Sequence, residues 1–215
     1  MRLCVLFSVV VFVGVLAAGA YAQVRPVRPS DAALLKRAPT YEERVAQQVA
    51  ATLTRLHPKV RCAPLGIPGL SSSILGVTLF VGTRPAGYFL LVPQMCADLA
   101  AFHQSPASYD PRTCKDSACL TTDAGVAMAL ATVSHESYHL LGYTNEAQVE
   151  CYGMQSIWYV ANKLGANVAE AEAIGTFYAT DMYPARRTQT PTYWTAECRD
   201  GGRYDLRPAS RAWPN

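Results

Sequence analysis

The order of apolar and polar residues predicts an α+β domain. Apolar residues recur along one helical face over residues 40–56, after a capping-box pattern formed by Thr40 and Glu43. A second apolar face runs over residues 122–141 and stops at Gly142, which makes this segment the clearest predicted helix. This helix is expected to begin at a cap formed by one of its first two residues.

Other segments complete the predicted element order. Helices are also expected over residues 94–103, 145–164 and 166–183, and strands over residues 74–81 and 88–92. The two strands should form an antiparallel pair joined by the Gly- and Pro-containing loop between them. The fold class predicted is therefore a small antiparallel sheet followed by helices.

The amino terminus has the composition of an export signal. Residues 1–22 carry one charged side chain, an apolar run and then a stretch of small residues that ends in Ala-Tyr-Ala. A membrane anchor over residues 3–22 is the alternative, because an apolar stretch of about 18 residues can cross a bilayer. Residues 23–39, with several prolines and basic residues, predict a flexible leader, and residues 40–215 a single domain.

Charge and cysteine content narrow the class of protein further. Without Arg2 the chain has 18 basic residues (19 − 1) against 16 acidic ones, and the basic ones are scattered, which argues against a nucleic-acid partner. An even set of cysteines in an exported chain predicts three disulfides, although only the closest pair suggests a particular local loop. A zinc-thiolate cluster is the alternative. The candidates are Cys62, Cys96, Cys114, Cys119, Cys151 and Cys198.

The segment His135-Glu136-Ser137-Tyr138-His139 carries the most specific chemistry in the chain. A helix has 3.6 residues per turn, so His135 and His139 project from one face and can direct two ring nitrogens at one ion. Glu136 then lies beside that ion and can take a proton from water that zinc activates. The motif predicts a Zn²⁺ site with Glu136 as the general base.

This motif and the segment after it resemble the zincin metallopeptidases, and among them the gluzincins. Glu146 and Glu150 stand in the pattern Asn-Glu-Ala-Gln-Val-Glu, which is typical of that branch. The resemblance implies a zincin-like fold, Glu146 as third zinc ligand, and Glu150 as a carboxylate that hydrogen-bonds a ligand histidine. The connection after the motif is short, so Glu150 as the ligand stays open, with Glu170 and Glu172 as further alternatives.

A looser resemblance is to a group of exported actinobacterial proteins that share this motif. It is carried by the segments around Cys96, Glu150 and Cys198. This second resemblance implies export, and it leaves the substrate open.

Together these features predict an extracytoplasmic zinc hydrolase whose substrate is a peptide or protein. The alternative is an exported zincin-like binding or structural module, held by disulfides, that catalyses nothing. Tyr138, Tyr143 and Tyr152 flank the motif as candidate donors to an oxyanion, or as packing residues.

Overall fold

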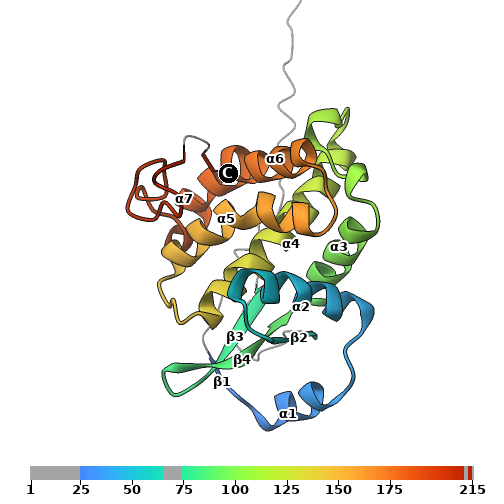
Figure 1. Ribbon diagram of the computed structural model, residues 1–215, viewed down its shortest axis with the longest axis vertical. Helices are drawn as coiled ribbons and strands as arrows, with labels where there is room; N and C mark the ends of the chain where they lie inside the picture. Colours follow the sequence, from blue (N-terminus) through green and yellow to red (C-terminus); the bar gives the residue numbers. More distant parts are fainter. Residues whose placement is uncertain (1–24, 65–73, 211–212, 215) are drawn as a thin grey trace, which may run out of the picture.

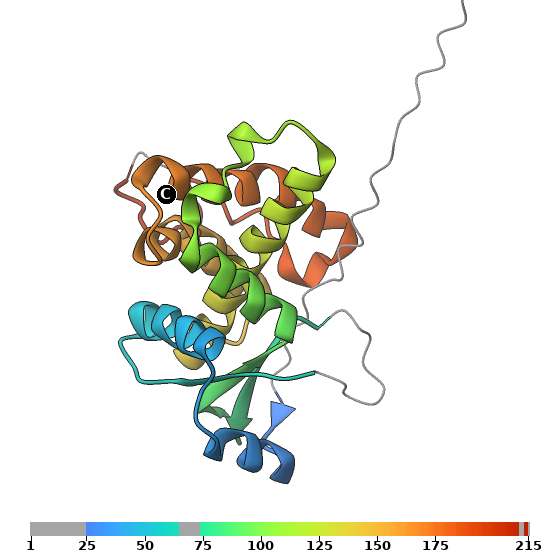
Figure 2. The ribbon, with the colours of Figure 1, turned by 90° about the vertical axis from the view of Figure 1, so that its right-hand side faces the viewer.

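A small sheet and a group of helices make up the fold of the computed structural model, which describes residues 25–64, 74–210 and 213–214. Both views show the sheet and α1 toward one end of the molecule and α6 toward the other (Figures 1 and 2). The strands are β1 (Arg25–Pro26), β2 (Lys59–Cys62), β3 (Gly76–Val81) and β4 (Arg84–Leu91). The α-helices are α1 (Pro29–Lys36), α2 (Tyr41–Thr54), α3 (Pro93–Gln104), α4 (Ser117–Leu140), α5 (Glu146–Lys163), α6 (Val168–Phe177) and α7 (Arg186–Gln189). The α+β class is confirmed.

The sheet is mixed, so the prediction of a purely antiparallel sheet is wrong. Its order is β1-β3-β4-β2, in which β3 and β4 form the expected antiparallel pair and each outer strand runs parallel to its neighbour. The outer strands have two and four residues, too few to display the alternation that marks a strand. The predicted loop is also shorter, because β4 begins at Arg84, directly after a turn in which Gly82 adopts a φ of 60°.

Helix boundaries follow the caps that the structure uses. The capping box of α2 forms as predicted, with Thr40 and Glu43 bonded to each other's backbone nitrogens. However, α4 begins earlier than expected, because Asp116 accepts a hydrogen bond of 2.8 Å from the backbone nitrogen of Cys119. The two expected caps, Thr122 and Asp123, both lie inside the helix, and Asp123 is 1% exposed.

The helix α4 is the centre of the domain. It contacts α2, α3, α5 and both long strands. Its length and apolar composition also fit a membrane span. However, half of its apolar 18-residue stretch is buried inside the domain, as the core helix of a folded domain can be. Gly153 of α5 allows a close approach, since a Cβ there would lie 3.1 Å from the backbone nitrogen of His135 on α4.

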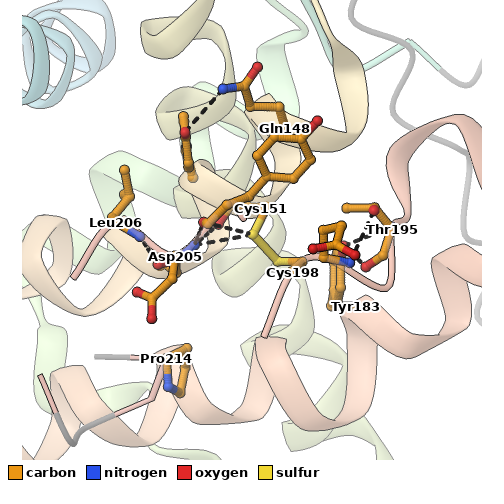
Figure 3. Close-up of a disulfide and its surroundings, with 12 residues drawn as sticks. Gln148, Cys151, Tyr183, Thr195, Cys198, Asp205, Leu206 and Pro214 are labelled. Atoms are coloured by element: carbon orange, nitrogen blue, oxygen red, sulfur yellow. Dashed lines mark hydrogen bonds between the residues drawn. A yellow bond between two sulfur atoms is a disulfide. The ribbon is translucent and has the colours of Figure 1, made fainter. Parts of the chain in front are cut away.

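The three predicted disulfides are present. They join Cys62 to Cys96, Cys114 to Cys119, and Cys151 to Cys198. The zinc-thiolate alternative is wrong for these six residues, because each sulfur is already bonded to another. The third bond ties the C-terminal segment to α5 (Figure 3), where the Gln155 side chain also accepts a hydrogen bond of 2.8 Å from the Leu206 backbone nitrogen.

Part of the predicted leader has regular structure. Its described residues, from Arg25 onward, include β1 and α1, and β1 pairs with β3. The buried Arg61 side chain donates hydrogen bonds to the carbonyls of Leu34 and Arg37, at 3.1 and 2.9 Å. These contacts hold the segment to β2. The predicted signal, residues 1–22, lies outside the described residues.

The ionisation of Asp123 makes the stability of the fold depend on pH. Burial, with the nearby negative charge of Asp110, raises the pKa of Asp123 to about 6. Because this value lies above that of the unfolded chain, about 3.9, ionised Asp123 destabilises the fold above about pH 6, and the penalty disappears as the pH falls toward 4. We expect Asp123→Asn to raise the melting temperature by about 2 to 4 °C near pH 8 and to leave it unchanged near pH 4, by circular dichroism.

The matched control is Asp200→Asn, which changes an exposed carboxylate. It should leave the melting temperature unchanged at both pH values. An effect of Asp123→Asn that is equal at high and low pH would contradict the role given to its ionisation.

Candidate metal centre

Three potential metal ligands converge between α4 and α5. His135 Nε2 lies 3.1 Å from His139 Nε2 and 3.1 Å from Glu146 Oε2, and His139 Nε2 lies 3.4 Å from the same oxygen. Ligand atoms about 2.0 to 2.1 Å from a tetrahedral zinc stand roughly 3.3 to 3.4 Å apart. The three side chains therefore form a group that could hold a metal ion, in which the two histidines are buried and Glu146 is half-buried.

The turn between the helices brings Glu146 to the histidines. The helix α4 ends at Leu140, and Gly142 follows with a φ of 92°, which reverses the chain within a few residues. Asn145 then caps α5 by accepting a hydrogen bond of 2.9 Å from the Gln148 backbone nitrogen, so Glu146 is the first residue of that helix. The short connection thus suffices to place Glu146 beside the histidines.

The second ring nitrogen of each histidine also has a partner. His139 Nδ1 donates to the Tyr143 carbonyl at 2.7 Å, which leaves the Nε2 lone pair of the neutral ring free for a metal. His135 Nδ1 bonds Glu150 Oε2 at 2.9 Å. Glu150 therefore lies on the far side of the His135 ring from Glu146, and the geometry favours Glu146 as the ligand.

The other two glutamates considered as ligands lie elsewhere. Glu170 Oε2 accepts a hydrogen bond of 2.9 Å from the Asn167 backbone nitrogen and so caps α6. Glu172 is exposed on the same helix. The structure brings neither of them into the group of ligand atoms.

Glu150 is held by two residues from the C-terminal part of the chain. The Tyr178 hydroxyl donates to Glu150 Oε1 at 2.5 Å, and Arg186 Nε lies 3.3 Å from the same oxygen. Burial opposes ionisation, but the Arg186 charge and the hydrogen bonds from His135 and Tyr178 outweigh it and lower the pKa of Glu150 to about 2. Glu150 is thus a fixed carboxylate behind His135.

The two carboxylates also act on His135 itself. Burial disfavours a charged ring, but the hydrogen bonds to Glu146 and Glu150 outweigh it and raise the pKa of His135 to about 10. The environment of this ring therefore favours a positive charge, which a proton or a metal ion can supply.

Glu136 lies next to the ligand group without belonging to it. It is 1% exposed, and the hydroxyl of Thr78 on β3 donates a hydrogen bond of 2.6 Å to its Oε2. Gly76 makes room for the other oxygen, because a Cβ there would lie 2.6 Å from Glu136 Oε1. Burial raises the pKa of Glu136, against the opposing charges of His139 and His135.

The flanking tyrosines pack against one another. The rings of Tyr138, Tyr143 and Tyr152 lie 5.3 to 6.1 Å apart, and the Tyr138 hydroxyl bonds the Ser156 hydroxyl at 2.9 Å. A different tyrosine, the buried Tyr193 of the C-terminal segment, contacts the His135 ring at 5.6 Å between centroids. The contacts among the three flanking tyrosines fit the packing alternative, and a role as donors to an oxyanion stays a prediction.

Sequence reasoning missed several residues of this region. Gly76 and Thr78 belong to a strand whose sequence indicates only a buried strand of the core. Arg186 and Tyr193 come from a Pro- and Arg-rich tail that contains no recognisable motif. A π-helical turn over Tyr178–Met182 helps to bring Tyr178 and Arg186 to the same carboxylate, and no spacing rule in the sequence signals it.

No protein-family model matches this sequence, and comparisons with curated proteins and with solved structures found no match. The gluzincin assignment therefore stays a resemblance carried by the segment from His135 to Glu150.

The first prediction for this centre concerns metal content. Protein reconstituted with zinc at neutral pH should hold about one zinc per chain, because three ligands converge on one position. His135→Ala and His139→Ala should abolish binding, since two remaining ligands rarely hold zinc. Plasma mass spectrometry measures the metal, with His57→Ala, outside the ligand group, as the matched control. A wild type that takes up no zinc would refute the site.

The second prediction separates the two carboxylates at His135. Glu146→Gln should weaken zinc binding most, because it replaces a negatively charged ligand with a neutral amide, which is a poor zinc ligand. Glu150→Gln should weaken it about 10- to 100-fold, because the amide holds the ring less firmly. Competition with a chelator gives both affinities. If Glu150→Gln loses the metal while Glu146→Gln keeps it, the ligand assignment is reversed.

Proposed function

We propose that this protein is a zinc-dependent hydrolase that cleaves peptide bonds outside the cytoplasm. The observation that carries the proposal is the arrangement at the end of α4, where His135, His139 and Glu146 converge and the Glu136 carboxylate lies beside them, bonded to Thr78. A site that only stabilises a fold has no need of a buried carboxylate that is not a ligand.

Each side chain has a distinct part in the proposed reaction. His135, His139 and Glu146 hold the metal, and zinc, when bound, polarises the substrate carbonyl and acidifies water. Glu136 accepts a proton from the attacking water and returns it to the leaving amine. The hydrogen bond from Thr78 orients Glu136, and burial raises its pKa toward the range in which a carboxylate both accepts and donates.

Charge balance supports a divalent cation. The buried or half-buried carboxylates of Glu136, Glu146 and Glu150 carry three negative charges, and Arg186 offsets one, which leaves two (3 − 1). Histidines that bind a metal are neutral and add no charge. A zinc ion in the group of ligands, in place of the proton that His135 would otherwise hold, would neutralise the remaining two negative charges.

Extracytoplasmic location and membership of the gluzincins are further parts of the proposal. Three disulfides are compatible with an oxidising compartment, since such bonds are rare in the cytosol. The composition of residues 1–22 supports export, and the pattern of residues from His135 to Glu150 supports the gluzincin resemblance, although the connection between His139 and Glu146 is shorter than is typical of that branch.

One observation favours a non-catalytic zinc module as the second candidate. His135 and Glu136 are 3% and 1% exposed, so a substrate has little direct access to them in this conformation. In that case zinc would only tie α4 to α5, and Glu136 would be a buried hydrogen-bond acceptor of Thr78.

Replacement of the general base separates these candidates. Glu136→Gln should keep zinc and the fold while it lowers peptide hydrolysis by at least about 100-fold, because an amide cannot accept the proton. The comparison needs metal content, melting temperature and cleavage of a peptide library on the same preparations. Glu172→Gln, on an exposed helix position, is the matched control. A wild type that binds zinc yet cleaves nothing would favour the non-catalytic module.

A further inference from the structure

A cavity lies apart from the candidate metal centre. It measures about 720 Å³ and lies between α3, the first half of α4 and the chain from the end of α6 to α7. Met95, Met128, Phe177 and Met182 supply much of its apolar wall. Small-molecule sites commonly measure about 300 to 1,000 Å³, so the cavity is large enough for an organic ligand.

This cavity does not include the proposed metal ligands or Glu136. The two regions share Arg186, which is one of the residues that line the cavity and whose guanidinium lies 3.3 Å from Glu150 and 3.1 Å from the Tyr178 hydroxyl. The Arg186 charge is therefore already balanced by Glu150, and the cavity is a separate site.

The charged side chains of the wall are mainly acidic. Asp98 and Asp181 line the cavity, and Arg186 is the one basic residue that lines it within the part of the chain that the structure describes. Asp98 accepts a hydrogen bond of 2.7 Å from Gln94 and forms no ion pair within the described residues. Burial raises the pKa of Asp98 against this hydrogen bond, so its carboxylate lacks the stabilisation that a cation would give.

The side chains around this carboxylate suit an apolar molecule of variable shape. Methionine has an unbranched, polarisable side chain that adapts to different ligands, and the cavity wall carries three. Gly125 of α4, which also lines the cavity, lies beside Asp98, since a Cβ there would be in ordinary contact with Asp98 Oδ2 at 3.5 Å. A positively charged nitrogen at Asp98 would form a charge-assisted hydrogen bond with it.

We propose that this cavity binds an organic cation with a large apolar body. The apolar body lies against Met95, Met128 and Phe177, and the ammonium group bonds the Asp98 carboxylate. An organic anion is disfavoured because the wall carries two carboxylates against one guanidinium, and that guanidinium is paired with Glu150.

The test uses three probes of equal chain length and different head charge. Octylammonium, octanol and octanoate are titrated into the whole protein at neutral pH by calorimetry, with and without bound zinc. Octylammonium should bind about tenfold more tightly than octanol, and octanoate most weakly, because a partly buried charge pair is worth about one decade in affinity. Zinc-free protein should give the same order, so the result does not depend on the proposed hydrolase activity.

Two variants locate the binding in the cavity. Asp98→Asn should bring the affinity for octylammonium down to that for octanol, whereas Asp200→Asn, on an exposed loop, should change nothing. Leu120→Lys places a cation in the wall at a side chain that is 41% exposed, so the fold should tolerate it. This variant should weaken octylammonium and strengthen octanoate by several-fold each. Absence of saturable binding, equal affinities for all three probes, or indifference to both variants would overturn the proposal.

Discussion

The close packing of α5 on α4 is the contact on which the candidate centre depends. Gly153 allows the α5 backbone to pack closely on α4, because a Cβ at this position would lie only 3.1 Å from the backbone nitrogen of His135. Gly142 allows the chain to reverse direction between the two helices. At a larger separation Glu146 and Glu150 could not reach the two nitrogens of one imidazole ring. Two glycines without any ligand atom of their own thus set the positions of the candidate metal ligands.

The second constraint is the burial of charged side chains, and residues from the C-terminal part of the chain compensate for it. A carboxylate such as Glu150 is costly to bury unless charges and hydrogen bonds compensate for the lost water. Tyr178 and Arg186 supply that compensation, and Tyr193 shields the assembly by packing on both His135 and the Arg186 guanidinium. The tail is therefore a structural part of the centre rather than an appendage.

Sequence reasoning reached the features that depend on local spacing. The capping box at Thr40 and the two histidines one helical turn apart follow from rules that span a few residues. Glu146, at the start of α5, was a candidate through the resemblance to the gluzincins. The contribution of Thr78 could not be found in this way, because it bonds Glu136 across 58 positions of the chain. Arg186 is similar, since the pairing with Glu150 depends on a π-helical turn and on how the tail folds back. The parallel edge strands also escaped prediction, because their partners come from distant segments.

The disulfide between Cys151 and Cys198 depends partly on features that the sequence shows and partly on the tertiary fold. Its cysteines were recognisable as candidates, yet their pairing follows from the return of the tail to α5, where Cys151 directly follows Glu150 (Figure 3). The bond holds the tail close to the residue that orients His135. With Tyr193 packed on the ring, the side chains of His135 and His139 are 4% and 1% exposed, whereas that of Glu146 is 17% exposed. Of the three side chains, Glu146, at the start of α5, is therefore the most accessible, whereas Tyr193 of the tail covers part of the His135 ring.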